Sequence, residues 1–250
     1  GEDGLVIRGT GMETVSGAEI REDVGKISEK RVVGVVITHG HTDHLGGLAA
    51  FVDSGDVQVW AREGLQDESN TLREAGINRQ RKRGAMQAGF MLKPEQRINN
   101  GIAKAYWPKR GGAVFESAHE AKPTHFTTDD RTRVSFAGVD LDLVVADGET
   151  SDALYIWFPK EAVLFAGDNF YKSWPNLSPI RGSAYRDVRT WAMTVDAMFN
   201  EQPEVLVPGH TRPIVGSEVA AEMLTNYRDA IQFVFDKTVE GINEGLTPNQ

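Results

Sequence analysis

Three histidines and one aspartate lie within a single short stretch of the sequence. They are His39, His41, Asp43 and His44, and they include half of the chain's six histidines. In an extended segment, side chains two positions apart point to the same side, so His39 and His41 are expected to converge. Imidazole and carboxylate ligands without thiolate suit Zn, Mn or Fe. The stretch therefore predicts a metal-binding loop, and the alternative is a polar loop that carries these histidines by chance.

Three later positions offer ligands of the same kind. Each lies beside a glycine, which lets the backbone approach a crowded centre closely. They are Glu149, Asp168 and His210. Taken singly, each is typical of an ordinary turn. One cluster of ligands cannot complete two metal sites, but these positions, in order behind the histidine-rich loop, supply the further ligands that two sites need.

The elements that must position these residues alternate between strands and helices. Residues 32–38 form an almost unbroken β-branched run, which is typical of a strand buried on both faces and leads into the histidine-rich loop. Further strands are expected over residues 132–136, 139–146, 153–158, 162–166 and 205–207, with a hairpin turn at Gly138. Helices are expected over residues 13–27, 45–52, 188–200 and 219–243. Because no repeat or low-complexity linker interrupts this order, we expect one layered α/β domain over residues 1–250.

Composition argues against several classes of function. The chain has 27 basic and 36 acidic residues, and its formal charge of −9 argues against nucleic-acid binding, because phosphate backbones select basic surfaces. It has no cysteine, so disulfides, thiolate metal sites and cysteine nucleophiles are excluded. No apolar run approaches the ~20 residues of a membrane span. The first residues do not read as a signal peptide, and both the cytoplasm and the periplasm stay open as the compartment.

The order of these motifs resembles that of the metallo-β-lactamase superfamily. The shared pattern is a His-x-His-x-Asp-His loop, a Gly-[His/Glu]-Thr turn, a Gly-Asp bridging position and a final Gly-His. The resemblance implies an αββα sandwich, in which two mixed sheets are flanked by helices. It also implies two Zn²⁺ ions, with Mn or Fe as alternatives. The ligands carried over by position are His39, His41 and Glu149 for one ion, Asp43, His44 and His210 for the other, and Asp168 as the bridge.

The carboxylate at Glu149 indicates one branch of that superfamily. Most members have histidine at this position, whereas glutamate resembles the alkylsulfatase (type III sulfatase) branch. Residues 81–92, 176–191 and 227–248 also resemble this branch, so the match covers most of the chain. The resemblance implies hydrolysis of alkyl or aryl sulfate esters, which are small anionic substrates. The nucleophile would be a hydroxide shared by two metal ions, which forms at a pH of about 7.

Three stretches depart from the pattern of the branch. Residues 8–11 read Arg-Gly-Thr-Gly where Asp-Thr-Gly is common. Gly167 and Asp168 stand where sulfatases often have Ala-Glu as the bridge. The loop over residues 171–175 lacks the histidines that the resemblance would place there. The proton donor of the branch is therefore missing or replaced at this loop.

The resemblance also implies catalytic and substrate-binding roles. Asp43 and Asp168 would be the catalytic carboxylates, held at the metal centre. Arg181 would bind the anionic head in a bidentate way, and Asn176 would donate a further hydrogen bond. Lys172 would bind the anion or act as a general acid. The alternatives are a surface ion pair for Arg181, a turn residue for Asn176 and a solvated side chain for Lys172.

Two other classes of function fit the same residues. A lactonase, thioesterase or β-lactamase would use the same fold and metal ions, because one fold hosts many chemistries. A non-catalytic binding protein on a degenerate fold is the alternative from another class, and the complete ligand set argues against it. A homodimer is kept as one open oligomeric state.

Overall fold

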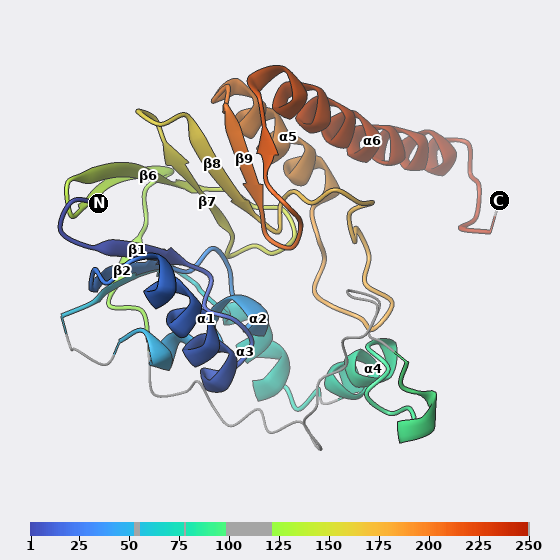
Figure 1. The fold of residues 1–250 in the computed structure, drawn as a ribbon. Helices are drawn as coiled ribbons and strands as arrows, with labels where there is room; N and C mark the ends of the chain where they lie inside the picture. Colours follow the sequence, from blue (N-terminus) through green and yellow to red (C-terminus); the bar gives the residue numbers. More distant parts are fainter. Residues whose placement is uncertain (53–55, 78, 99–121, 250) are drawn as a thin grey trace. The chain divides into compact units, whose positions relative to one another are not determined.

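The computed structural model describes residues 1–52, 56–77, 79–98 and 122–249 (Figure 1). The chain divides into two compact units. The larger unit comprises Gly1–Gln66, Ser117–Leu177 and Arg186–Gln250, and the smaller comprises Asp67–Glu116 and Ser178–Tyr185. Each unit has its own architecture, and the single domain expected over residues 1–250 stays a prediction.

The first sheet of the larger unit is parallel throughout. Its strands, in order, are β1 (Leu5–Arg8), β2 (Val32–Val36), β3 (Gln58–Arg62) and β4 (His125–Thr127). A strand that is covered on both faces can be apolar along its whole length, and the valine-rich β2 is an inner strand of this sheet. The buried strand predicted before the histidine-rich loop is therefore confirmed, although it ends slightly before residue 38.

Of the two helices predicted beside this sheet, one agrees with the structure and one does not. Helix α1 (Thr14–Ile27) follows β1 as expected. The single helix predicted over residues 45–52 is wrong, because α2 (Thr42–Leu45) ends there and a short 3₁₀ turn (Leu48–Ala50) follows. Gly46 and Gly47 separate the two, and a Cβ at Gly46 would clash with the carbonyl of Met12. Close packing against the segment after β1 thus interrupts the helix.

The second sheet has six strands and is mostly antiparallel. In chain order they are β5 (Arg131–Phe136), β6 (Val139–Val145), β7 (Leu154–Phe158), β8 (Val163–Gly167), β9 (Val205–Pro208) and β10 (Ile214–Val215). The β5–β6 hairpin turns through Ala137 and Gly138, both with positive φ, as a two-residue hairpin loop requires. Only β8 and β9 pair in parallel among the strands of this sheet that the structure describes, and α5 (Val188–Asn200) lies between them in the chain.

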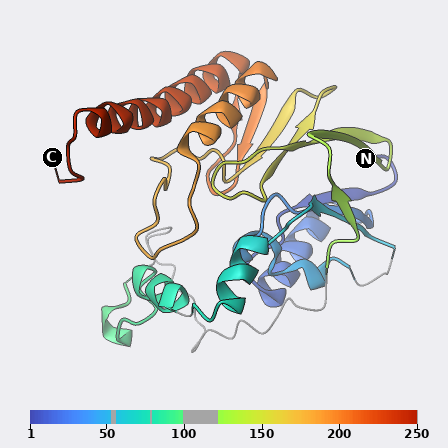
Figure 2. The same ribbon diagram turned by 180° about the vertical axis from the view of Figure 1, so that it is seen from behind.

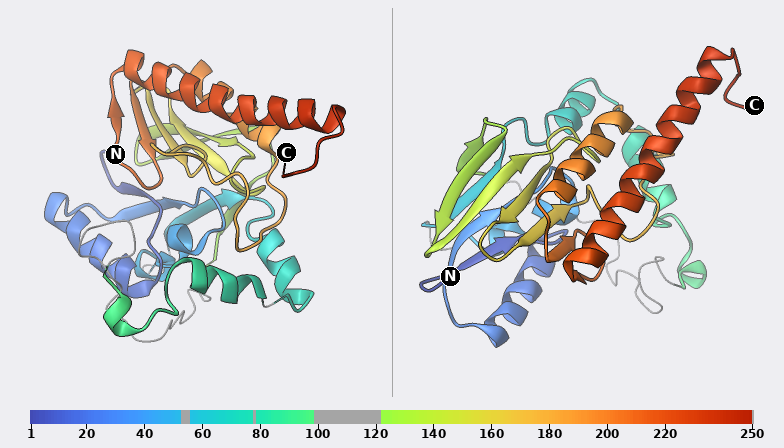
Figure 3. Two further views of the ribbon diagram at one scale, coloured as in Figure 1. Left: turned by 90° about the vertical axis from the view of Figure 1, so that its right-hand side faces the viewer. Right: turned by 90° about the horizontal axis from the view of Figure 1, so that it is seen from above.

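The two sheets and their helices form the predicted αββα sandwich. Apolar side chains from both sheets meet between them, including Val36 of β2 and Leu141 and Ile156 of the second sheet. Helices α5 and α6 (Ser217–Asn243) lie side by side on the outer face of the second sheet (Figures 2 and 3). Trp191 and Leu224, one from each helix, are fully buried there. The predicted ligands His39, Asp168 and His210 follow the ends of β2, β8 and β9, which belong to these packed sheets.

The smaller unit contains two short helices and a connecting segment. Helix α3 (Asp67–Glu74) and helix α4 (Arg79–Gln87) are followed by a 3₁₀ turn (Pro94–Gln96). Residues 178–185 lie against α4, since a Cβ at Gly84 would contact the side chain of Arg181. Among the residues that the structure describes in either unit, no helix is long and apolar enough to cross a membrane.

Candidate metal centre

The histidine-rich loop begins where β2 leaves its sheet. His39 follows the strand and is fully buried. His41 has an extended backbone and precedes α2, so Asp43 and His44 occupy that helix's single turn. The hydroxyl and the amide of Thr10 both donate to the carbonyl of His44, at 3.1 and 2.9 Å. The segment after β1 therefore fixes the far end of the loop.

All of the ligands predicted from the sequence meet at this loop, in two groups that share one residue. Within each group, one candidate ligand atom per residue lies within 4.8 Å of all the others. The first group is His39, His41, Glu149 and Asp168, and the second is Asp43, His44, Asp168 and His210. Asp168 is common to both groups, and the assignment of these residues to two ions stays a prediction.

The second group is the more closely packed of the two. His210 Nε2 lies 2.9 Å from Asp168 Oδ2 and 3.2 Å from Asp43 Oδ2. His44 Nε2 lies 3.3 Å from His210 Nε2 and 3.3 Å from Asp168 Oδ1. A Cβ at Gly209 would clash with Asp168 Oδ1, so the glycine before His210 permits the approach that its sequence position predicted.

The first group is looser and more deeply buried. His39 Nε2 lies 3.0 Å from His41 Nδ1 and 3.8 Å from Asp168 Oδ2. His41 Nδ1 lies 3.8 Å from Glu149 Oε2. Two imidazole nitrogens that face each other need either a proton on one of them or a cation between them. The candidate ligand atoms of this group all lie within 4.8 Å of one another.

The buried oxygens of this cluster test whether a metal ion fits. Glu149 Oε2 is buried and has no hydrogen-bond partner within the described part of the chain. Asp168 Oδ1 is also buried and lies 3.3 Å from His44 Nε2. A buried polar atom without a partner costs about 1–3 kcal/mol, and more when it carries charge. A cation ligated by both carboxylates and the imidazoles would remove that cost. The donors, imidazole and carboxylate alone, fit Zn²⁺.

The pKa values of the clustered carboxylates and histidines are shifted by burial and by one another. Burial, and then the charge of Asp168, raises the pKa of Glu149 to about 7. Burial also raises the pKa of Asp168, but hydrogen bonds with His210 and His44 outweigh it and hold that pKa well below its usual range. Hydrogen bonds with Asp168 and Asp43 raise the pKa of His210 to about 10. The carboxylates of the second group thus favour the positively charged form of His210.

A layer of polar residues that the sequence reasoning did not identify holds the first group in place. Asn169 accepts a hydrogen bond from the amide of Glu149 at 2.9 Å and donates to the carbonyl of Ala146 at 2.6 Å. Arg186 donates to Glu149 Oε1 at 2.8 Å. Asn169 directly follows Asp168, a predicted ligand, and this position is the one local signal for it in the sequence. Arg186 appeared in the sequence only as part of a resembling stretch.

A second polar link supports the histidine-rich loop itself. The buried carboxylate of Asp152 accepts from the amide of Gln66 at 2.8 Å and from the hydroxyl of Thr150 at 2.6 Å. The side chain of Gln66 donates to the carbonyl of Gly40, between the two ligand histidines, at 3.0 Å. The link ties this loop to the turn that carries Glu149.

The predicted substrate residues, unlike the predicted metal ligands, do not form one cluster in the described structure. Lys172 is exposed. Asn176 contributes main-chain contacts, since its carbonyl accepts from Arg186 at 2.7 Å and its amide donates to the hydroxyl of Tyr171 at 3.2 Å. Arg181 belongs to the smaller unit. The substrate-binding roles of these three residues stay predictions.

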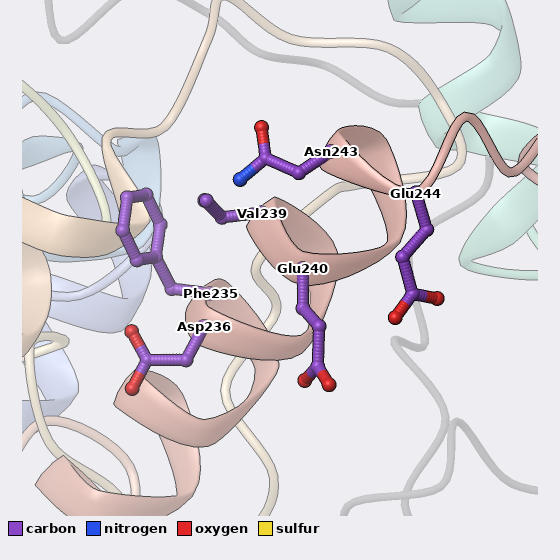
Figure 4. Close-up of a pocket in the computed structure, with 6 residues that line it drawn as sticks. All are labelled: Phe235, Asp236, Val239, Glu240, Asn243 and Glu244. Carbon is purple, nitrogen blue, oxygen red and sulfur yellow. The ribbon is translucent and has the colours of Figure 1, made fainter.

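A depression on the surface lies elsewhere, along the C-terminal half of α6 (Figure 4). It is lined by Phe235, Asp236, Val239, Glu240, Asn243 and Glu244. None of these is a predicted ligand or substrate residue, and three of them are acidic. The depression is therefore unsuited to an anionic substrate.

Comparison with known families gives one match over most of the chain. Residues 1–210 match the family described as the Metallo-beta-lactamase superfamily, and this range includes every predicted metal ligand. Among curated proteins, a linear primary-alkylsulfatase of a Pseudomonas strain is 30% identical over 99% of this chain. An alkyl/aryl-sulfatase of Saccharomyces cerevisiae is 29% identical over 88% of this chain. The chain spans only 47% and 34% of these two relatives.

Solved structures give the same architecture. A stereoselective inverting sec-alkylsulfatase from Pseudomonas superposes with a TM-score of 0.84 at 25% identity, over 99% of this chain and 40% of that chain. A metallo-beta-lactamase from Pontibacter korlensis gives a TM-score of 0.55 at 19% identity, over 90% of this chain and 84% of that chain, which shows the fold alone. The predicted αββα fold is thus confirmed both by the observed layers and by these neighbours.

Proposed function

The chain belongs to the metallo-β-lactamase superfamily, and we propose that it is a binuclear zinc hydrolase acting on alkyl or aryl sulfate esters. The observation that carries the proposal is the pair of ligand groups joined at Asp168, with a carboxylate at position 149. The names of the curated relatives supply the substrate class. Because the chain spans less than half of each, this activity is an inference for the chain.

The predicted ligands would form two sets, one for each ion. His39, His41 and Glu149 would hold one ion, Asp43, His44 and His210 the other, and the carboxylate of Asp168 would contact both. When bound, a pair of divalent ions acts as a Lewis acid and lowers the pKa of water to about 7. The same imidazole and carboxylate donors also accept Mn or Fe, so the identity of the ion is part of the proposal.

The chain's other polar residues would bind and orient the anionic ester. Arg181 is assigned to the sulfate head, because a guanidinium matches an oxyanion in a bidentate way. Asn176 and Lys172 are assigned as a further hydrogen-bond donor and a further positive charge. Lys172 is exposed, which suits an anion arriving from solvent. The homodimer that the sequence left open also stays a prediction.

Two measurements test the proposal. Elemental analysis of the purified protein should find about two zinc ions per chain, and dodecyl sulfate or p-nitrophenyl sulfate should be hydrolysed. His41→Ala should reduce the rate by more than about 100-fold, since changes beyond the direct ligands already cost 10–100-fold. The matched control is His125→Ala, because His125 of β4 stacks on Trp60 of β3 and lies outside both ligand groups.

The outcomes separate the competing functions. If sulfate esters are inert while a β-lactam, lactone or thioester is cleaved, the fold and metal centre hold and the substrate class is wrong. If zinc binds but no ester in that panel reacts, a non-catalytic binding protein is the better description. A chain that takes up no zinc contradicts the proposal entirely.

A further inference from the structure

Arg186 is a buried arginine whose charge is directed at one oxygen of Glu149. Only 4% of its side chain is exposed. Its Nη1 donates to Glu149 Oε1 at 2.8 Å and to the carbonyl of Asn176 at 2.7 Å. A buried charge is tolerated when it is paired and hydrogen-bonded, and both conditions are met here. An arginine in this position therefore has a fixed partner within the cluster.

Both partners of this ion pair are anchored by the same helix. Arg186 directly precedes Asp187, the residue that caps the N-terminus of α5. From within α5, Trp191 Nε1 donates to the carbonyl of Asn169 at 2.9 Å, and Asn169 in turn accepts from the amide of Glu149. Helix α5 thus positions Arg186 through its N-terminus, and it positions the backbone of Glu149 through Trp191 and Asn169.

The two oxygens of Glu149 have different surroundings as a result. Oε1 is occupied by the guanidinium of Arg186. Oε2 is buried, has no hydrogen-bond partner in the described residues, and lies 3.8 Å from His41 Nδ1. A carboxylate held by one oxygen cannot turn to present that oxygen elsewhere without breaking the bond. Only Oε2 is therefore available to the first ligand group.

We propose that Arg186 is a positioning residue that holds Glu149 Oε1 and thereby makes Glu149 a single-oxygen ligand, through Oε2, to an ion in the first group. The proposal rests on the metal centre proposed above. It concerns the ion shared by His39, His41 and Glu149, and not the ion held by Asp43, His44 and His210. Arg186 has no hydrogen bond to any member of that second group in the described structure.

Titration of the metal-free protein with zinc against a chromophoric chelator tests this. Arg186→Met should weaken one of the two sites by about 10–100-fold and leave the other unchanged, since residues that orient a ligand contribute this much to metal affinity. Titration with Co²⁺ should show an altered visible absorption band for the weakened site alone. Arg189→Met is the matched control, because Arg189 is exposed on α5 three residues away.

Two further variants keep the test decisive. Arg186→Lys preserves a buried paired charge, so it should fold even if Arg186→Met does not, and its affinity should lie between those of Arg186→Met and the unaltered protein. In a Glu149→Gln background, Arg186→Met should cost little additional affinity, because residues in contact are not independent. A purely structural role for Arg186 would instead lower the thermal stability of the metal-free protein and leave both affinities and the Co²⁺ spectrum unchanged.

Each result bears on one proposal only. Two zinc sites of unchanged affinity in Arg186→Met, or in Arg186→Lys when that variant alone folds, would overturn the positioning role and leave the metal centre intact. Equal weakening of both sites would also overturn it, because the role is confined to the first group. If the unaltered chain binds no zinc, the proposed function fails first.

Discussion

Two buried carboxylates of the second sheet, Asp142 and Glu149, differ in how completely the protein surrounds them. Asp142 lies within β6 and its side chain is 3% exposed; Glu149 follows the same strand and is 8% exposed. Both oxygens of Asp142 accept hydrogen bonds from Arg131 or Arg133, at 2.7 to 3.0 Å. Only one oxygen of Glu149 has such a partner.

The pKa values of the two groups move in opposite directions. The hydrogen bond from Arg133 is the main cause that lowers the pKa of Asp142, and it outweighs burial. Burial, with the charge of Asp168, raises the pKa of Glu149 in spite of Arg186. A buried carboxylate with a full set of partners stabilises the fold, whereas one with an unpartnered oxygen is poised to bind a cation. Both carboxylates are buried, so the oxygen without a partner is what distinguishes Glu149 from Asp142.

The largest expected effect comes from removing the carboxylate that both ligand groups share. Asp168→Asn keeps the shape of the side chain and removes its charge. We expect less than one metal ion per chain and a fall in kcat/KM for a sulfate ester on the order of 10³-fold, because Lewis-acid stabilisation is worth several kcal/mol and each 1.36 kcal/mol is tenfold. Elemental analysis and steady-state kinetics measure the two effects. Retention of two ions would show that Asp168, like Asp142, is a structural carboxylate and no metal ligand.

A smaller and different effect is expected at Asp142. Asp142→Asn should leave the metal content and the rate within about twofold of the original, because Asp142 lies outside both ligand groups. It should lower the free energy of unfolding by about 1–2 kcal/mol. Hydrogen bonds to a charged group are worth about 1.5–3 kcal/mol, and exposure of the two arginines reduces that value. Urea unfolding measures it, and a lost metal ion would contradict the structural role.

The smallest effect is the pH dependence of that same contribution. The pKa of Asp142 is lower in the folded chain than its unfolded value of about 3.9, so the unfolded chain binds the proton more readily. Its stabilisation is therefore fully present above about pH 4 and is lost as pH falls through the folded pKa. The difference in stability between the original chain and Asp142→Asn should shrink over that range. A difference that stays constant down to pH 3 would show that charge plays no part.

Much of this arrangement follows from local patterns in the sequence. The β-branched run of β2 and the hairpin at Gly138 are each determined by neighbouring residues, and both predictions are confirmed. The metal-binding role of the histidine-rich loop stays a prediction. The Arg186–Glu149 pair and the Asn169–Glu149 contact join residues 37 and 20 positions apart. No local periodicity encodes such contacts, since they depend on how α5 packs. The interruption after α2 was missed for the same reason, because it depends on contact with Met12.

The contact between His44 and His210 joins positions that are 166 residues apart in a chain with no cysteine. An ion held there would act as a cross-link, closing a loop that contains half the strands of the first sheet and most of those of the second. For covalent links, closing a loop of this length removes chain entropy worth about 4–5 kcal/mol from the unfolded state. Bound ions would therefore stabilise this protein as disulfides stabilise others. Their removal by a chelator would lower the free energy of unfolding of both sheets together.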